Sequence, residues 1–341
     1  WGNPMRAMLL SRIVSLDEVD TPLELVDLPV PEPNPGEVLI RVSACGVCHT
    51  ELDEIEGRTA PPKLPIIPGH EVIGRVEALG RSVTRWKPGE RVGVGWIHSS
   101  SGESDENVCP KFQATGRDTN GGYAEFMTVP EDYAYPIPDT FTDTQAAPLL
   151  CAGAVGFRAL KLTNIKDGDL LGMTGFGGSA HLVLQTAKHL FPHTKTFIFA
   201  RDPAAREFAL QLGAEWAGDT TDRSPQQLHA IIDTTPAWKP VVEALKNLRP
   251  SGRLVINAIR KEDADKDYLL NVSYHEHLWM EREIKSVANV TRRDISEFLP
   301  LAAEIPVTPE VQTYKLEEAN RALVDLKHRP IKGATVLLID E

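Results

Sequence analysis

The residues with the clearest chemical potential are a group of thiols and one imidazole, the side chains that zinc prefers. Cys45 and Cys48 form a C-x-x-C pair that runs into His-Thr-Glu-Leu-Asp. His70 follows in a Gly-His-Glu triplet, and Cys151 stands alone much further along the chain. Two of these thiolates together with the imidazole would suit zinc. Three protein ligands would leave the fourth coordination position open to water or substrate. Such a set predicts a catalytic zinc site rather than a closed structural one.

A glycine-rich turn further along the chain is of the kind that binds a dinucleotide. It reads Gly175-Phe176-Gly177-Gly178-Ser179-Ala180. The turn lies between an apolar stretch at 170–173 and an amphipathic stretch at 179–190, which is the strand–turn–helix context that such a motif needs. Gly175 would allow the tight turn, Gly177 the close approach to the pyrophosphate, and Ala180 stands where a third glycine is often found. An open zinc beside a nicotinamide implies hydride transfer to or from a zinc-polarised oxygen.

Length, charge and cysteine content narrow the class of protein. The 341 residues exceed one typical domain and indicate about two. The net charge of −12 argues against nucleic acid or an anionic membrane surface as a partner, and no continuous apolar run reaches the roughly 18 residues that cross a bilayer. Four cysteines make no disulfide framework, and without a secretory leader the expected compartment is the cytoplasm.

The elements that must position these residues follow two patterns. Up to about residue 140 the chain reads as short strands, such as 38–42 and 72–76, punctuated by Gly and Pro. Between about 142 and 259 apolar strands alternate with helical stretches, which is typical of a parallel doubly wound sheet. Two more helices and two strands are expected after about Thr291, and this tail should fold back on the first part of the chain.

Taken together, the motifs resemble the zinc-dependent alcohol dehydrogenases of the medium-chain dehydrogenase/reductase family. Each motif alone is weak, because a C-x-x-C pair could be half a zinc knuckle or a redox pair, and a lone histidine is more often a satisfied polar group. The resemblance also includes Gly121-Gly122-Tyr123-Ala124-Glu125-Phe126 and Gly333-Ala334-Thr335-Val336-Leu337, and covers essentially the whole chain. It implies an α/β fold with a GroES-like catalytic β domain at 5–155, completed by 292–341, and a doubly wound Rossmann domain at 156–291.

The resemblance assigns the residues that would hold the metal. By it, Cys48, His70 and Cys151 are the catalytic zinc ligands, and Cys45 is a small buried hydrophobic residue outside the ligand set. Glu51 matches the acid that orients the ligand histidine. Zinc held in this way would lower the pKa of a bound alcohol.

The same resemblance gives roles to four further residues. Thr50 matches the hydroxyl that takes the alcohol proton, and Glu71 matches a carboxylate that approaches the metal during ligand exchange. Asp53 stands where the proton relay often has a histidine, so it would accept the proton through water or ribose hydroxyls, or the relay would be shorter. His49 matches a cofactor-contacting position, although a partly exposed loop histidine is an equally good interpretation.

Many members of that family carry a second, structural zinc on four closely spaced cysteines. The matching stretch here, 99–110, has serines where those cysteines would stand, and Cys109 is the only thiol in it. One thiolate cannot build a closed tetrahedral site. The sequence therefore predicts one zinc per chain, no structural zinc, and a lobe held by hydrogen bonds and packing.

The end of the second nucleotide-domain strand indicates the cofactor. An acid there would bind the 2′-hydroxyl of NAD, whereas a neutral residue followed by arginine suits the 2′-phosphate of NADP. Family spacing puts Ala200 at the acid's position, with Arg201 next to it and Arg206 about one helical turn further on. NADP is therefore favoured over NAD, although Asp202 would serve if the register slipped by two residues.

Two residues are predicted to line the substrate pocket. Trp96 matches an aromatic residue that lines the cleft in relatives, although plain core filling is an alternative. Ile55 stands where ethanol-preferring relatives can carry a bulky tryptophan, and a smaller residue there would admit larger or aromatic substrates.

The leading interpretation is a zinc-dependent alcohol dehydrogenase or aldehyde reductase. It would transfer hydride reversibly between NAD(P) and the carbinol carbon of a primary alcohol, and the resemblance implies a homodimer or homotetramer. A zinc-dependent polyol or sugar dehydrogenase of the same fold is one alternative, although the retained Cys151 speaks against it. A non-catalytic nucleotide-binding relative is another, and the presence of all three ligands and of Thr50 speaks against that.

Overall fold

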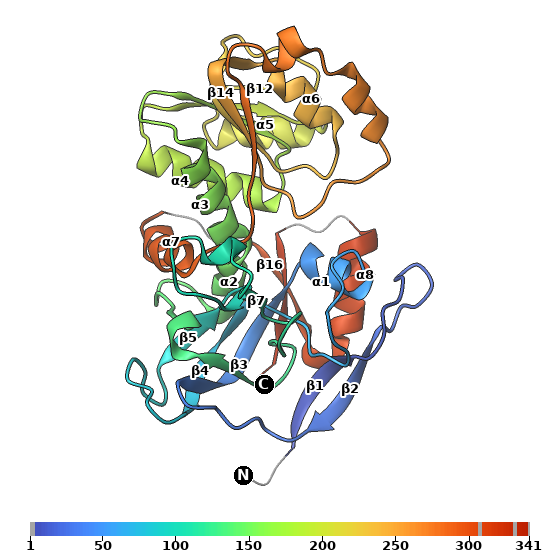
Figure 1. Cartoon of the computed structure of the whole chain (residues 1–341), viewed down its shortest axis with the longest axis vertical. Coiled ribbons are helices and arrows are strands. Elements are labelled where there is room, and N and C mark those ends of the chain that lie inside the picture. Colours follow the sequence, from blue (N-terminus) through green and yellow to red (C-terminus); the bar gives the residue numbers. More distant parts are fainter. Residues whose placement is uncertain (1–3, 306–308, 330–332, 340–341) are drawn as a thin grey trace. The chain divides into compact units, whose positions relative to one another are not determined.

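The computed structural model describes residues 4–305, 309–329 and 333–339 (Figure 1). The chain divides into two compact units. Unit 1 comprises Trp1–Ala154 and Asn289–Glu341, and unit 2 comprises Val155–Ala288. Helix α3 (Ala152–Thr163) contains the point at which the first range ends and the second begins.

Unit 1 is built on a seven-stranded, mainly antiparallel sheet. Its strand order is β16-β17-β3-β4-β5-β9, with β8 also paired to β3. The strands are β3 (Glu37–Val47), β4 (Val72–Leu79), β5 (Arg91–Val94), β8 (Phe126–Pro130), β9 (Tyr135–Pro136), β16 (Val311–Lys315) and β17 (Ala334–Leu338). Strand β3 is central, and its run of apolar residues is buried along almost its whole length. Because β3 is paired with a strand on each side and its side chains are buried, it gives a rigid base to the loop that follows it.

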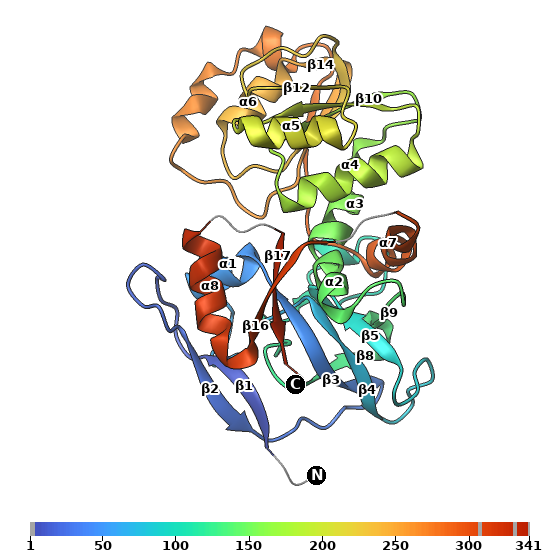
Figure 2. The same cartoon turned by 180° about the vertical axis from the view of Figure 1, so that it is seen from behind.

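The C-terminal part of the chain completes this sheet. Strand β17 pairs antiparallel with β3, with Leu337 opposite Cys45, and Figure 2 shows β16, β17 and β3 side by side. The tail thus folds back on the first part of the chain, as expected from the sequence.

Shorter elements surround the sheet of unit 1. Two small antiparallel pairs join β1 (Met5–Leu10) to β2 (Leu23–Leu28) and β6 (Ile97–Ser99) to β7 (Gln113–Ala114). The α-helices are α1 (His49–Ile55), α2 (Asp143–Ala146), α7 (Arg292–Glu304) and α8 (Ala319–His328). Single 3₁₀ turns are η1 (Glu106–Val108), η2 (Glu131–Tyr133), η3 (Ala147–Leu150) and η6 (Leu316–Glu318).

Unit 2 is a six-stranded parallel sheet with helices on both faces. The strand order is β12-β11-β10-β13-β14-β15, and all five neighbouring pairs are parallel. The strands are β10 (Leu170–Thr174), β11 (Lys195–Phe199), β12 (Trp216–Gly218), β13 (Leu228–Asp233), β14 (Leu248–Ile256) and β15 (Glu283–Ser286). The helical elements are α4 (Gly178–Leu190), α5 (Pro203–Gln211), α6 (Lys239–Leu245), the 3₁₀ segment η4 (Lys266–Asn271) and the π-helical turn η5 (Tyr274–Leu278).

Alternation along the strands of unit 2 makes two separate cores. Ile198 of β11 and Ile232 of β13 face a core shared with α3, α4 and α5. Phe197 and Ile231, one residue earlier on each strand, face a second core shared with α6. This alternation is what a sheet covered on both faces requires, and the predicted doubly wound Rossmann fold is confirmed.

One described stretch, Asp143–Thr163, has the length and hydropathy of a membrane span, which a search for unbroken apolar runs misses because polar residues interrupt it. Of its most apolar window, 67% is buried inside the protein. Core helices of soluble proteins pass the same test, so this single stretch is weak evidence for a membrane.

Candidate metal centre and nucleotide-binding turn

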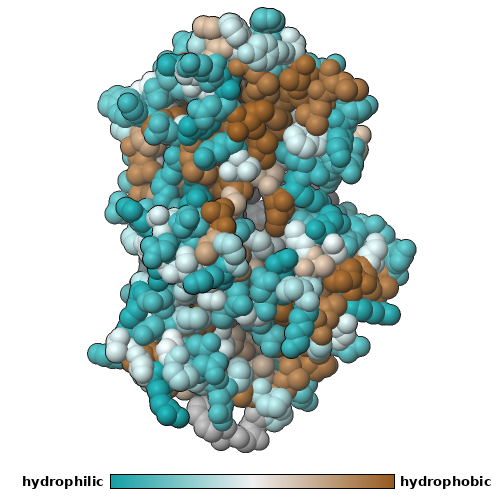
Figure 3. Space-filling model, viewed as in Figure 1, coloured by the Kyte–Doolittle hydropathy of each residue, from teal (hydrophilic) through white to brown (hydrophobic). Residues whose placement is uncertain are grey.

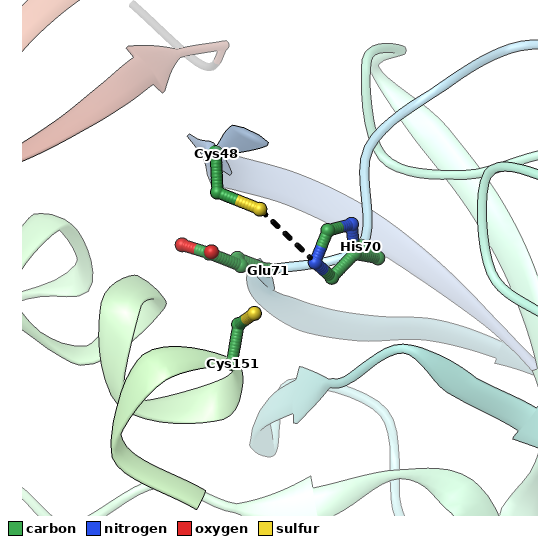
Figure 4. A group of neighbouring side chains, drawn as sticks. All are labelled: Cys48, His70, Glu71 and Cys151. Atoms are coloured by element: carbon green, nitrogen blue, oxygen red, sulfur yellow. Dashed lines mark hydrogen bonds between the residues drawn. The ribbon is translucent and has the colours of Figure 1, made fainter. Parts of the chain in front are cut away.

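Four side chains from separate parts of unit 1 converge on one point. They are Cys48, His70, Glu71 and Cys151, and their ligand atoms all lie within 4.8 Å of one another (Figure 4). Cys48 follows β3, His70 and Glu71 precede β4, and Cys151 ends the turn η3. Within the described ranges this is the one group of three or more such side chains arranged to hold a metal.

Local structure explains how each ligand is held. Cys48 is the N-cap of α1: its Sγ accepts from the Thr50 N–H at 3.4 Å, and its own N–H donates to Glu51 Oε2 at 2.8 Å. This reciprocal pair is a capping box with a thiol in the place of the usual hydroxyl. Gly46 makes room for the cluster, since a Cβ there would lie 1.9 Å from Glu71 Oε2.

The orientation of His70 is set by Glu51. His70 Nδ1 lies 2.5 Å from Glu51 Oε1, and both side chains are almost completely buried. The other ring nitrogen, Nε2, faces Cys48 Sγ at 3.6 Å, the contact drawn in Figure 4. Burial lowers the pKa of His70, but the charges of Glu51 and Cys48 outweigh it and raise the pKa well above its usual value. A carboxylate behind the imidazole is the arrangement that fixes a metal-binding histidine.

The cluster fits zinc in both spacing and charge. Tetrahedral zinc, with bonds of about 2.3 Å to sulfur and about 2.0 Å to nitrogen, sets these two atoms about 3.5 Å apart. Burial raises the pKa of Glu71 to about 7, while a hydrogen bond with Cys151 and burial raise that of the Cys48 thiol well above its usual value. Both shifts disfavour the charged forms of the thiol and the carboxyl, and a divalent cation would favour those charged forms.

The other residues predicted around the metal lie on α1. Thr50, in its first turn, is 7% exposed, and His49 is exposed. Asp53 is fully buried, and its Oδ1 accepts from Arg58 Nε at 2.5 Å. Nothing in the spacing of Asp53 and Arg58 singles out this ion pair, so the sequence alone does not predict it.

Of the two predicted pocket residues, one borders the metal centre and one is fully buried. The Trp96 ring lies 6.2 Å from the His70 ring, nearly edge-on, and Trp96 Nε1 donates to Glu54 Oε1 at 3.4 Å. The Ile55 side chain is 0% exposed, packed inside unit 1. Burial raises the pKa of Glu54 well above its usual value, so this carboxyl favours its neutral form.

Residues 99–110, which we call the lobe, are organised by the buried carboxylate of Glu106. Its Oε2 accepts from Tyr133 OH at 3.0 Å and lies 3.2 Å from Arg292 Nε. Its Oε1 accepts from the Arg292 N–H at 2.7 Å, and its carbonyl accepts from Ser100 Oγ at 2.7 Å. Cys109, at the other end of η1, is a free thiol.

In unit 2 the glycine-rich turn lies between β10 and α4. Gly175 has φ +76°, and its N–H donates to the Phe199 carbonyl at 2.9 Å. Gly177 is the N-cap of α4, Gly178 is the first helical residue, and Ala180 is fully buried in the core beneath the helix. The turn thus has the left-handed glycine and the close helix–sheet packing that its sequence predicts.

The end of β11 has no free acid at the predicted position. Ala200 is buried and Arg201 is exposed. The carboxylate of Asp202 caps α5 by accepting from the Ala204 N–H at 2.9 Å. Arg206 donates to the Ala200 carbonyl at 2.9 Å and lies 3.6 Å from Asp219, so two basic side chains flank this strand end.

Comparisons with known proteins agree with this fold. The family model described as "Alcohol dehydrogenase GroES-like domain" matches residues 34–139, which lie in unit 1. The probable alcohol dehydrogenase AdhA of Mycobacterium tuberculosis is 41% identical over 329 residues, with 93% of each chain covered. An alcohol dehydrogenase of Geobacillus stearothermophilus is 32% identical over 345 residues, covering 95% of this chain and 98% of the relative.

Solved structures give the same fold at lower identity. The CAD enzyme of Helicobacter pylori, solved with NADP(H), has a TM-score of 0.81 at 23% identity, covering 99% of this chain and 98% of that one. A GroES-like unit carrying this cluster and a Rossmann unit define a medium-chain dehydrogenase. The chain belongs to the medium-chain alcohol dehydrogenase family, as its sequence relatives show.

Proposed function

We propose that this chain is a zinc-dependent alcohol dehydrogenase or aldehyde reductase. It would transfer hydride reversibly between NADP, in preference to NAD, and the carbinol carbon of a primary, bulky or aromatic alcohol. The observation that carries the proposal is the convergence of Cys48, His70 and Cys151 with Glu51 directly behind the imidazole. The family relationship supports the reaction class.

In this proposal each side chain of the centre has a separate task. Cys48, His70 and Cys151 would hold one zinc, and Glu51 would keep His70 Nε2 directed at it. When bound, the zinc would act as a Lewis acid on the substrate oxygen and the nicotinamide would accept or return a hydride. Thr50, in the first turn of α1, would take the alcohol proton at its hydroxyl.

The ion pair of Asp53 favours a short proton relay. The Oδ1 of Asp53 is already engaged by the Arg58 guanidinium and is not open to a proton from Thr50. Asp53 would therefore hold Arg58, whose side chain is 39% exposed, while the proton leaves Thr50 through water or ribose hydroxyls. His49, which is exposed next to Thr50, would contact the cofactor.

The preference for NADP is supported by the end of β11. Ala200 offers no carboxylate to a ribose 2′-hydroxyl, and the carboxylate of Asp202 is engaged in capping α5. Arg201 would meet the 2′-phosphate, with Arg206 as a second cation beside it. Replacing Arg201 by serine should raise the KM for NADPH at least about tenfold and leave that for NADH within about twofold.

The preference for bulky substrates depends on Trp96 and Ile55. The half-buried indole of Trp96 beside His70 would be one apolar wall of the substrate site next to the metal. Ile55 is fully buried. Its predicted role would be to leave space in the substrate pocket that a larger side chain at this position would fill.

A homodimer formed through β15 is our proposal for the assembly of this enzyme, which we expect in the cytoplasm. Strand β15 is an edge strand with all four residues exposed. Figure 3 shows an apolar area on the surface of unit 2, and the exposed apolar residues near β15 in the sequence are Tyr274, Trp279, Met280 and Ile284. An exposed edge with apolar residues near it is a place where strands of two copies can pair. Light scattering should give the dimer mass for the native chain and the monomer mass for Ile284→Lys.

The proposed function is tested by the initial rate of benzaldehyde reduction with NADPH and with NADH, each with and without a strong zinc chelator. We expect chelator-sensitive turnover, faster with NADPH, from protein that holds one zinc per chain. Cys109→Ser, a thiol outside the centre, is the matched control and should keep zinc and rate. Turnover that favours NADH would overturn only the cofactor preference. No turnover from metal-replete protein would point to a polyol dehydrogenase or a non-catalytic relative.

A further inference from the structure

A buried ion pair in unit 2 lies outside every role described so far. Asp233, the last residue of β13, is fully buried, and Lys261, in the segment after β14, is 10% exposed; their charged groups are in direct contact. A charged pair taken out of water is costly unless its remaining hydrogen-bonding groups are also satisfied. The partners of these two side chains therefore show what the pair holds in place.

Lys261 ties two loops together. Besides Asp233, its ammonium group donates to the carbonyl of Thr235 at 2.7 Å and to that of Ala237 at 3.0 Å. All three N–H bonds of the ammonium group are thereby used. The loop after β13 is in this way fastened to the segment after β14.

Asp233 links this ion pair to the end of β10 by hydrogen bonds. Its Oδ1 accepts from Thr174 Oγ1 at 2.5 Å and from Thr235 Oγ1 at 2.8 Å. The Thr174 carbonyl in turn accepts two hydrogen bonds from Thr234, one from the backbone N–H at 3.0 Å and one from the side-chain hydroxyl at 2.9 Å. Thr174 is the residue directly before Gly175, so the network reaches the first residue of the glycine-rich turn.

The turn is packed against this fixed loop. A Cβ at Gly175 would lie 2.9 Å from Thr234 Oγ1 and 3.0 Å from Thr235 Cγ2. Gly175 therefore sits in contact with two threonines whose positions depend on Asp233 and Lys261. A dinucleotide turn binds through backbone N–H groups, whose positions must be set before the ligand arrives.

We infer that Asp233 and Lys261 are positioning residues that hold the glycine-rich turn in its cofactor-binding shape. The inference rests on the proposed function, because it takes the turn at 175–180 as the dinucleotide site. A purely electrostatic role would have a different signature: Asp233 would repel the cofactor phosphates, and its neutralisation would tighten binding. Positioning requires instead that loss of either partner weakens binding.

The test is a direct NADPH titration followed by cofactor fluorescence, without turnover. We expect Lys261→Met and Asp233→Asn each to raise the Kd for NADPH about tenfold. In the double variant, which has no unpaired charge, the increase should be smaller than the product of the two single effects. Lys195→Met is the matched control, because Lys195 pairs with Glu215 at 3.0 Å where both side chains are about half exposed; its Kd should stay at the native value.

Two further measurements separate this role from general destabilisation. Thr174→Val removes the hydrogen bond to Asp233 and leaves the ion pair intact, so it should raise the Kd about threefold in a protein that is still folded by circular dichroism. In steady-state assays the KM for the cofactor should rise in Lys261→Met, Asp233→Asn and Thr174→Val, while kcat at saturating cofactor stays within about twofold.

The outcomes distinguish this inference from the proposed function. Native protein that binds neither NADPH nor NADH would overturn the proposed function itself. Native protein that binds NADPH, together with an unchanged Kd in Thr174→Val and in folded Lys261→Met, would overturn only the positioning role. Tighter binding by Asp233→Asn would also overturn it and would favour simple charge neutralisation.

Discussion

The metal centre and the carboxylate of Glu106 in the lobe are two buried polar sites of unit 1 that balance their charge in different ways. At the metal centre, thiols and carboxyls gather around one histidine, and the pKa values of Cys48 and Glu71 are raised. In the lobe, the carboxylate of Glu106 meets the guanidinium of Arg292 at 3.2 Å. In our proposal the first region takes up its cation as zinc, whereas the second has the guanidinium of Arg292 as a cation of its own.

The largest effect should come from removing one ligand of the metal centre. We expect Cys151→Ser to reduce the rate of aldehyde reduction at least about a thousandfold, because a weakened site no longer keeps zinc for Lewis-acid catalysis. Metal analysis should show the loss of zinc in parallel. Cys109→Ser, in the lobe, should keep both, and a Cys151→Ser protein that is fully active and zinc-loaded would contradict the assigned ligand set.

The lobe should respond in stability and not in metal content. Glu106→Ala leaves the Arg292 guanidinium and the Tyr133 hydroxyl without their partner, and should lower the free energy of unfolding by about 2–4 kcal/mol. Zinc content and activity per folded molecule should be unchanged, as measured by urea unfolding, metal analysis and rate. The control is Glu103→Ala, an exposed acid of the same lobe. Loss of zinc from Glu106→Ala would mean that the lobe also depends on a metal.

The residue behind the ligand histidine should have an intermediate effect. Glu51→Gln keeps the size of the side chain but removes the negative charge 2.5 Å from His70 Nδ1. We expect zinc affinity to fall about 10- to 100-fold, since such supporting carboxylates usually contribute that much. Competition with a calibrated chelator measures this affinity. Unchanged affinity would show that the imidazole is held by packing alone.

The smallest effect should appear at a third carboxylate, Glu56, which like Glu106 has cations of its own. Burial alone would raise the pKa of Glu56, but hydrogen bonds from Lys327, the Leu16 N–H and Arg58 lower it to about 2. A carboxyl with a depressed folded-state pKa stabilises the fold fully above its usual pKa, and this contribution is lost as the pH falls from about 4.5 towards 2.

This pH dependence can be measured by unfolding at pH 7, 4 and 3. Glu56→Gln should cost about 1–3 kcal/mol at pH 7, and the difference from native protein should shrink as the pH falls. Glu18→Gln, at an exposed position in the same unit, is the control and should show no such trend. A difference that stays constant down to pH 3 would contradict the depressed pKa.

What the sequence could predict was local. The pattern of residues 170–190 predicted the first strand, turn and helix of unit 2 to within one residue, because apolar periodicity and glycine spacing act over a few residues. The choice of Cys48, His70 and Cys151 as ligands came from the resemblance to zinc-dependent alcohol dehydrogenases. The structure has Cys48 at the N-cap of α1 and His70 ahead of β4.

Contacts between distant segments could not be predicted. Glu106 and Arg292 are 186 residues apart, and their meeting depends on how α7 packs against the lobe. The Asp233–Lys261 pair depends in the same way on two loops that only the completed sheet brings together. Ion pairs between distant segments leave no periodic pattern in the sequence, so only the three-dimensional structure shows them.

The N-cap position of Cys48 couples metal binding to the folding of helix α1. Helix α1 has only seven residues, and a helix of that length is not stable by itself in water. The sulfur that would bind zinc is the same atom that accepts the Thr50 N–H and starts the helix. Occupancy of the metal site and ordering of α1 are therefore thermodynamically linked. The amide hydrogens of α1 should exchange with solvent more slowly in proportion to the zinc bound, so that the helix itself reports the metal content of the enzyme.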